Sequence, residues 1–214
     1  MEDRLDASSL NGLRRVPREF YCVRALDLAP RLLGLILVRE TPDGVTAGRL
    51  TEVEAYEGPE DRASHAFGRR RTTRTEVMYG PPGHAYVYFT YGMHWLFNVV
   101  AAQEEIPHVV LVRSIEPLTG LALMVRRRGG ALPLAEGPAR LAQAMDITGR
   151  DNAKDLVSSD LYIAFPPQGL DSAVDYEVTC RIGVDGSGEA RNYPWRFVEK
   201  GSAPARIRFR SRAH

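Results

Sequence analysis

Apolar and polar residues alternate in several stretches of this chain, in the pattern that predicts β-strands. The run VTAGRLTEVEAY (45–56) alternates throughout, and the turn signal TPDG separates it from the apolar run LILVRE. Side chains on a strand point to alternate faces, so Glu52, Glu54 and Tyr56 lie on the same face. The pattern therefore predicts a hairpin that carries two carboxylates and an aromatic ring on one side.

A second hairpin is predicted from two runs rich in aromatic and β-branched residues, HAYVYFT (84–90) and HWLFNVVA (94–101), which YGM separates. The bend falls near Gly92, and Tyr91 lies at its tip. A large ring gains little from folding at an exposed bend. A protruding ring beside a turn is suited to fill the gap that a displaced base leaves in a nucleic-acid stack.

The other periodic segments predict three helices and four further strands. The helices are LAPRLLG (28–34) with Asp27 as its N-cap, PLTGLALMVRRR (117–128), and EGPARLAQAMDI (136–147) with Pro138 in its first turn. The strands are HVVLVRSIEP (108–117), LYIAF (161–165), YEVTCRIGV (176–184) and WRFVEKG (195–201). The stretch between the two hairpins has no sustained period and is predicted to be a loop.

These elements predict a single mixed α+β domain over residues 18–214, a curved antiparallel β-sheet with surrounding helices and a protruding β-hairpin. We expect residues 1–17 to form a flexible N-terminal segment, with ordered structure beginning near Phe20. The 214 residues are 44% hydrophobic and 26% charged, the composition of an ordinary globular protein. No stretch has the apolar length of a signal-peptide core or a membrane span, so we expect a cytoplasmic protein without a membrane partner.

Charge and cysteine content narrow the chemistry. Cys22 and Cys180 lie far apart, in no CxxC or Cys/His cluster, so we expect buried thiols and neither a metal site nor a disulfide. The net charge of +1 does not decide for or against nucleic acid, although arginines cluster at 69–74, 126–128 and 206–212. Since Lys154 and Lys200 are the only lysines, amine nucleophiles are few.

The two carboxylates of the first hairpin are the strongest candidates for chemistry, because a carboxylate on a half-buried face is costly unless it is paired or used. Glu52 fits a solvated strand edge or an arginine salt bridge. A glycoside hydrolase that divides acid and base roles between Glu52 and Glu54 stays open, since their backbones are roughly 6.5 to 7 Å apart. His65, His84 and His94 match no compact metal-ligand spacing.

The run from Thr51 to Asn98, TEVEAYEGPEDRASHAFGRRRTTRTEVMYGPPGHAYVYFTYGMHWLFN, resembles the signature core of the alkyladenine (3-methyladenine) DNA glycosylase family. A thinner similarity extends from Phe20 through LAPRLLG to RIGV (181–184) and WRFVEKG. The resemblance implies a DNA-repair enzyme that flips alkylated or deaminated purines, of the 3-methyladenine or hypoxanthine type, out of damaged double-stranded DNA. It implies hydrolysis of the N-glycosidic bond without metal or cofactor, by a nucleoid-associated monomer.

Catalytic roles follow from the resemblance where residues match. Glu54 matches the general base that activates the attacking water, and Arg113 matches the arginine that helps to position this water. Tyr91 matches the residue that intercalates in the minor groove. With Lys154 and Lys200 outside the matched core, we expect a monofunctional glycosylase that leaves an abasic site.

The resemblance also implies a base pocket. Tyr56 and His65 match residues that contact the flipped base on its two faces, and Tyr88 matches a second stacking tyrosine. Asn98 matches an asparagine that crowds the amino group of guanine, and Val184 matches an apolar lining residue.

The loop at 69–74 departs from the family pattern. It reads RRRTTRTEVMY where relatives have a glycine-arginine-threonine run followed by arginine-asparagine, so Thr73 and Thr75 are unusual. A non-catalytic lesion-binding protein is a further alternative, although the presence of Glu54 and Arg113 argues against it.

Overall fold

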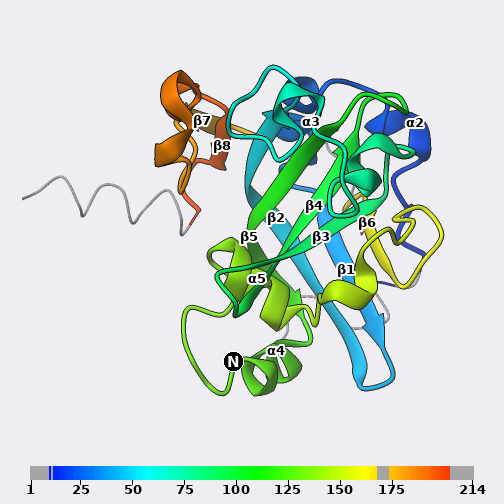
Figure 1. Cartoon of the computed structure of the whole chain (residues 1–214). Coiled ribbons are helices and arrows are strands. Elements are labelled where there is room, and N and C mark those ends of the chain that lie inside the picture. The colour runs from blue at the N-terminus through cyan, green and yellow to red at the C-terminus, as the bar shows by residue number, and fades with distance from the viewer. Residues whose placement is uncertain (1–9, 11, 168–173, 203–214) are drawn as a thin grey trace, which may run out of the picture.

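Both predicted hairpins form in the computed structural model, which describes residue 10, residues 12–167 and residues 174–202. The strands are β1 (Ile36–Thr41), β2 (Gly44–Glu57), β3 (Ala85–Thr90), β4 (His94–Ala101), β5 (His108–Thr119), β6 (Leu161–Ala164), β7 (Tyr176–Thr179) and β8 (Arg196–Glu199). Each pairs antiparallel with its neighbours, in the order β3-β4-β5-β2-β1-β6, and β8 joins β2 to β7. The sheet curls into a half-barrel, as the sequence predicts (Figure 1).

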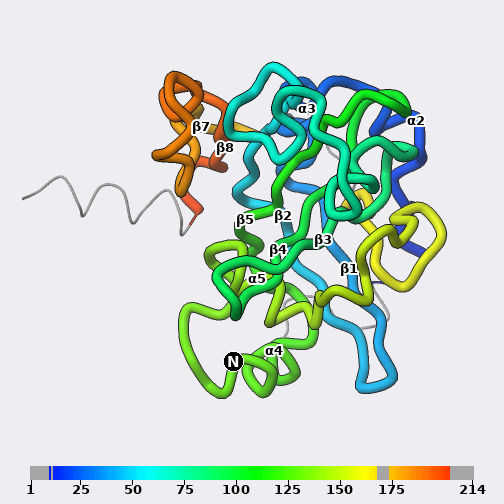
Figure 2. Tube along the Cα trace, viewed as in Figure 1, coloured from blue at the N-terminus to red at the C-terminus, as the bar shows by residue number. Residues whose placement is uncertain are grey.

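The helices cover the sheet on one side and at one end. They are α2 (Arg18–Tyr21), α3 (Ala25–Leu32), α4 (Leu121–Arg127) and α5 (Pro138–Ala144), with the 3-10 turns η1 (Phe67–Arg69), η2 (Glu76–Tyr79), η3 (Gly149–Asp151) and η4 (Asp185–Asn192). Helix α3 packs against β2 and β5, while α5 packs against β4, β5 and α4. Figure 2 shows α4 and α5 side by side at the bottom of the view. In the described part of the chain, no helix is both long and apolar enough to span a membrane.

Alternation in β2 and β5 decides which residues enter the core. Val53 and Ala55 of β2 and Val112 of β5 are fully buried in the main cluster with Leu28 and Leu32 of α3. Full burial of such an aliphatic side chain contributes about 1.5 to 3 kcal/mol. Residues on the opposite face of β2 are thereby held at fixed positions, and Glu54 is one of them.

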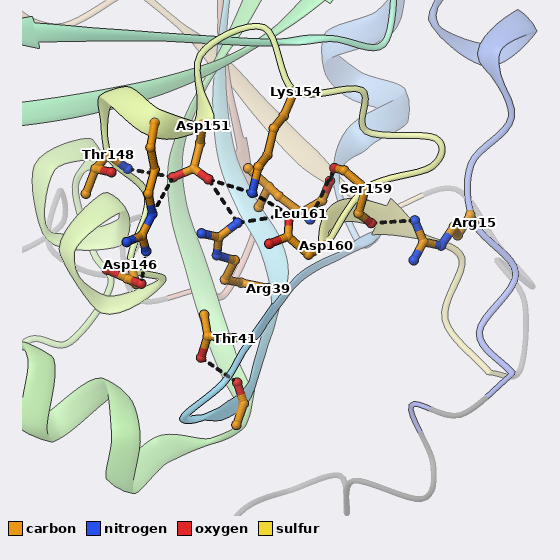
Figure 3. A network of polar contacts seen from close by, with 12 residues as sticks. Arg15, Arg39, Thr41, Asp146, Thr148, Asp151, Lys154, Ser159, Asp160 and Leu161 are labelled. Atoms are coloured by element: carbon orange, nitrogen blue, oxygen red, sulfur yellow. Dashed lines mark hydrogen bonds and ion pairs between the residues drawn. The ribbon is translucent and has the colours of Figure 1, made fainter.

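An ion network joins β1 to the segment that follows η3 (Figure 3). Arg39 of β1 lies 2.9 Å from Asp151, and their side chains are 2% and 0% exposed. Lys154 lies 3.0 Å from Asp151 and also pairs with Asp160. The backbone beside this network pairs with β3, because the Ala85 N–H donates to the Lys154 carbonyl at 2.8 Å. The segment that the network holds therefore pairs with β3, an edge strand that would otherwise present unpaired backbone groups.

Two predictions near the N-terminus are wrong. Helix α3 begins at Ala25, so Asp27 lies in its first turn and is not the N-cap. The Leu26 N–H donates instead to the Glu57 carboxylate at 3.1 Å, a tertiary contact that replaces a local cap. Ordered structure begins before Phe20, because Val16 is fully buried, whereas residues 1–9 and 11 lie outside the described residues.

Other boundaries also differ from prediction. Strand β5 continues to Thr119, and the helix expected from residue 117 begins only at Leu121. Between them Gly120 has φ +74°, and a Cβ there would clash with the Val45 carbonyl oxygen, so the chain turns at this glycine. Both cysteines are exposed rather than buried, because they follow the ends of α2 and β7 at the surface. The arginine cluster at 206–212 lies outside the described residues.

Candidate active site

Four neighbouring strands each contribute one residue to a row across the sheet. Glu54 of β2 pairs with Leu111 of β5, Leu111 pairs with Asn98 of β4, and Asn98 pairs with Tyr86 of β3. Residues directly opposite one another in an antiparallel sheet have side chains on the same face. The strand register therefore gathers a carboxylate, an amide and a phenol on one surface of the sheet.

A cavity of about 320 Å³ opens on this face. It is lined by seven of the eight residues that the sequence predicts for the site, namely Tyr56, His65, Tyr88, Tyr91, Asn98, Arg113 and Val184. Two hollows beside α5, of about 470 and 450 Å³, contain none of them. The eighth residue, Glu54, is fully buried behind Tyr56 and Arg113.

Three donors contact the Glu54 carboxylate. The Tyr56 hydroxyl donates to Oε2 at 2.8 Å, the Ile182 backbone N–H donates to Oε1 at 2.8 Å, and Arg113 Nη1 lies 3.2 Å from Oε1. Burial raises the pKa of Glu54 above its ordinary value of 4.5, and these contacts only partly offset the rise. An ionised carboxylate offers about four acceptor positions. Among the described contacts, Oε2 accepts one hydrogen bond and has two acceptor positions, so it can accept a second hydrogen bond.

Glu52, on the same face of β2, is committed to other partners. Its carboxylate accepts hydrogen bonds from Arg113, from Arg196 of β8, and from the Ser114 hydroxyl at 2.8 Å. Burial opposes its ionisation, but the two guanidinium groups outweigh burial, so the pKa of Glu52 is lowered. Of the two roles predicted for Glu52, the arginine salt bridge is confirmed and the solvated strand edge is wrong.

Arg113 reaches both carboxylates because it lies in a β-bulge. Glu52 pairs with Ser114, but Val53, the next residue of β2, pairs with Val112, so one residue of β5 is skipped. The extra residue on β5 is Arg113, and a bulge of this kind redirects the side chain of the inserted residue. Its Nε lies 2.9 Å from Glu52 and its Nη1 lies 3.2 Å from Glu54.

Aromatic side chains form one wall of the cavity. The His65 ring lies edge-on to Tyr88, with ring centroids 4.6 Å apart, and His65 Nδ1 is 2.8 Å from the Tyr86 hydroxyl. Burial lowers the pKa of His65 to about 4, with further contributions from Arg74 and Arg70. The imidazole is therefore neutral at neutral pH, with one ring nitrogen as a donor and the other as an acceptor.

An ion pair that the sequence did not predict lies behind Tyr56. The Arg181 guanidinium is 4.5 Å from the Tyr56 ring centroid and makes two hydrogen bonds to Asp61, with both charged side chains 0% exposed. Asp61 also accepts a hydrogen bond from the Ala63 N–H at 2.9 Å, a turn that orders the loop carrying His65. An aspartate at the start of a turn is the one local signal that could have indicated Asp61.

The segment after β7 brings backbone groups to the cavity. The strand predicted over 176–184 ends at Thr179 because Arg181 turns inward, where it also donates to the carbonyl oxygen of Ala55 at 2.9 Å. This turn presents the Ile182 N–H to Glu54 and places Val184 in the cavity lining.

The remaining predicted residues occupy the second hairpin. Asn98 is 2% exposed, and its side-chain amide donates to the Tyr86 carbonyl oxygen at 3.0 Å. Tyr91 lies at the hairpin tip with φ +52°, and its side chain is 80% exposed beside the mouth of the cavity. The described residues contain no group of three or more histidine, cysteine or acidic side chains arranged to hold a metal ion.

The chain is similar to proteins of one family over most of its length. The family model described as Methylpurine-DNA glycosylase (MPG) matches residues 19–203. A protein of Bacillus licheniformis is 47% identical over 191 residues, which are 87% of this chain and 94% of the relative. Proteins of Clostridium acetobutylicum and Bacillus subtilis are each 44% identical, over 86% and 87% of this chain and 94% of each relative. All three are named "Putative 3-methyladenine DNA glycosylase".

Proposed function

Because this chain belongs to the methylpurine-DNA glycosylase family, we propose that it is a DNA-repair enzyme that removes 3-methyladenine-type purines from damaged double-stranded DNA. The reaction is hydrolysis of the N-glycosidic bond between the damaged base and its sugar. The products are the free base and an abasic site.

The damaged nucleotide reaches the enzyme by base flipping, because the glycosidic bond of a stacked base is inaccessible inside a duplex. Two features support this step. The cavity of about 320 Å³ has the size of a small-molecule site and aromatic walls. Beside its mouth, the 80% exposed Tyr91 ring has no packing role in the fold and is free to enter the gap that the base leaves.

Glu54 is the general base, and the observation that carries this assignment is the acceptor position on its Oε2. Glu54 is fully buried, so a water reaches this position when the Tyr56 side chain that covers Oε2 moves aside, and the raised pKa of the carboxylate strengthens it as a base. Cleavage of an N-glycosidic bond gives the sugar oxocarbenium character, which a nearby negative charge stabilises. Arg113 orients the carboxylate through its contact at 3.2 Å.

Recognition of the base comes from stacking and shape. Tyr56 and Tyr88 supply faces on which a purine can stack, at roughly 1 to 3 kcal/mol per base. The neutral His65 supplies one hydrogen-bond donor to a lesion. Asn98 is held in place by its hydrogen bond to Tyr86, where it restricts the room for the amino group of guanine.

Water, rather than an amine, is the nucleophile. Lys154 and Lys200, the only lysines of the chain, pair with acidic residues: Lys154 with Asp151 and Asp160, and Lys200 with Asp175. A protonated, paired amine is a poor nucleophile for Schiff-base formation. The enzyme is therefore monofunctional.

A direct test is to incubate the protein with duplexes that contain an alkylated adenine or hypoxanthine, and to measure alkali-labile sites. We expect strand breaks with the wild-type protein and none with Glu54→Gln, which retains duplex binding. Tight binding without base release by the wild-type protein would show a lesion-binding protein instead. Glu52→Gln is the matched variant: if it folds and loses base release as completely as Glu54→Gln, the two-carboxylate hydrolase mechanism is supported and our assignment of Glu54 fails.

A further inference from the structure

Positive charges surround the cavity, and most of them are neutralised locally. Arg113 pairs with Glu52 and Glu54, Arg196 pairs with Glu52, and Arg181 pairs with Asp61. Arg74, in the arginine-rich loop before η2, is different: within the described ranges of the chain, no acidic side chain lies within ion-pair distance of it. Its positive charge therefore remains uncompensated beside the aromatic wall.

The contacts of Arg74 are with that wall. Its guanidinium carbon lies 4.8 Å from the centroid of the Tyr88 ring. Burial raises the pKa of the neighbouring Tyr86 hydroxyl, and the positive charge of Arg74 opposes this rise. These two rings are 5.4 Å apart, and both contact His65. Arg74 is thus an exposed cation beside the Tyr88 and Tyr86 rings, and both of these rings contact His65.

We propose that Arg74 is a specificity-determining residue, which biases excision toward uncharged damaged purines and against cationic alkylated purines. This inference rests on the proposed glycosylase function. A tyrosine face that already interacts with a guanidinium offers less attraction to a second cation, and like charges at short range repel. A purine methylated at N3 or N7 carries a positive charge, whereas a deaminated purine such as hypoxanthine does not.

The pKa of His65 reflects the same positive charge. Besides burial, Arg74 and Arg70 lower the pKa of His65 to about 4, which is the response of a cation-forming group to nearby positive charge. The other stacking ring, Tyr56, also has a guanidinium against it, but Asp61 neutralises Arg181 there. The unbalanced charge therefore acts mainly from the Tyr88 side of the cavity.

The experiment compares single-turnover base release from two duplexes, one with 7-methylguanine and one with hypoxanthine. For Arg74→Gln we expect the ratio of the cationic to the neutral rate to rise about fivefold, which corresponds to roughly 1 kcal/mol of like-charge repulsion in a water-exposed setting. Arg74→Lys keeps the charge and should retain most of the wild-type ratio. Arg69→Gln removes a charge from the same loop near Tyr79 and should leave the ratio unchanged.

An unchanged ratio would overturn the proposal, and if both rates fell equally, the loss would indicate a phosphate contact instead. A second readout needs no DNA. In an NMR titration, with the His65 signal assigned by comparison with His65→Asn, Arg74→Gln should raise the pKa of His65 from about 4. If the wild-type protein releases neither base, the proposed function fails; an unshifted His65 titration in Arg74→Gln refutes the charge effect itself.

Discussion

The buried pair of Asp61 and Arg181 gives the sharpest test of what holds the site together. Asp61→Asn removes the negative charge, and Arg181 then keeps the carbonyl oxygens of Ala55 and Ala190 as its acceptors. Because both side chains are 0% exposed, water cannot solvate the remaining guanidinium charge. Breaking one side of such a buried pair costs about 3 to 5 kcal/mol. For a chain of this length, that loss lowers the Tm by about 6 to 20 °C.

Asp61→Asn removes the ion pair with Arg181 but keeps the turn that Asp61 forms. Asparagine keeps a carbonyl oxygen that can still accept the hydrogen bond from the Ala63 N–H. The loop that carries His65 is therefore retained. We expect base release to slow even below the lowered Tm, because Asp61 no longer holds the guanidinium that packs against the Tyr56 ring.

Thermal unfolding followed by circular dichroism measures the effect, with denaturant unfolding as a check. Glu76→Gln is the control, since it breaks an exposed pair with Arg71 and should cause no resolvable change. The double variant Asp61→Asn/Arg181→Met should recover much of the stability, because no buried charge remains. A Tm for Asp61→Asn within about 2 °C of the wild-type value would refute this account, since such a shift corresponds to 1 kcal/mol or less.

Three further outcomes are expected from the site. Tyr91→Ser should weaken duplex binding and slow base release at an unchanged Tm, since the ring is 80% exposed; unchanged excision kinetics would rule out the wedge. The acid limb of the kcat profile should lie above 4.5, the ordinary value for Glu54, and not at about 4, where His65 titrates. Borohydride added during turnover should trap no covalent complex with DNA, and a trapped complex would implicate Lys154 or Lys200 as a nucleophile.

The parts of the site that could be predicted from the sequence are those that local periodicity determines. Strand alternation puts Glu54 and Tyr56 on one face, and the bend after β3 exposes Tyr91, because side-chain direction depends only on neighbouring residues. Family resemblance selected Asn98, Arg113 and the other lining residues, which have no local signature. Seven of these predicted residues do line one cavity.

The rest depends on contacts between residues distant in sequence. The choice between Glu52 and Glu54 follows from Arg196 of β8, which lies 144 residues from Glu52. The end of β7 depends on Arg181 reaching Asp61, 120 residues away. A strand register or bulge of this kind is set by tertiary pairing, so residue patterns alone could not reveal it.

Glu54 itself should reduce the stability of the protein at neutral pH. Its pKa is higher in the folded protein than the ordinary value of 4.5, because burial disfavours the charged form. The stabilisation linked to a raised pKa is complete below the unfolded value and is lost as the pH rises through the folded value. Glu54→Gln removes the ionisable group while its side chain can still accept from the Ile182 N–H. We therefore expect this variant to have a higher Tm than the wild-type protein at pH 7, and no advantage below pH 4.5.

Glu52→Gln is the matched comparison, with the opposite sign. The pKa of Glu52 is lowered, so its ionised form contributes stability that is present above the ordinary value and is lost as the pH falls through the folded value. This variant should have a lower Tm at pH 7, with a deficit that shrinks in acid. If both variants lower the Tm equally at pH 7, the two carboxylates are equivalent ion-pair partners of Arg113. If instead the Tm changes have opposite signs, Glu52 stabilises the fold and Glu54 is retained at a cost in stability. A catalytic role of Glu54 explains that cost.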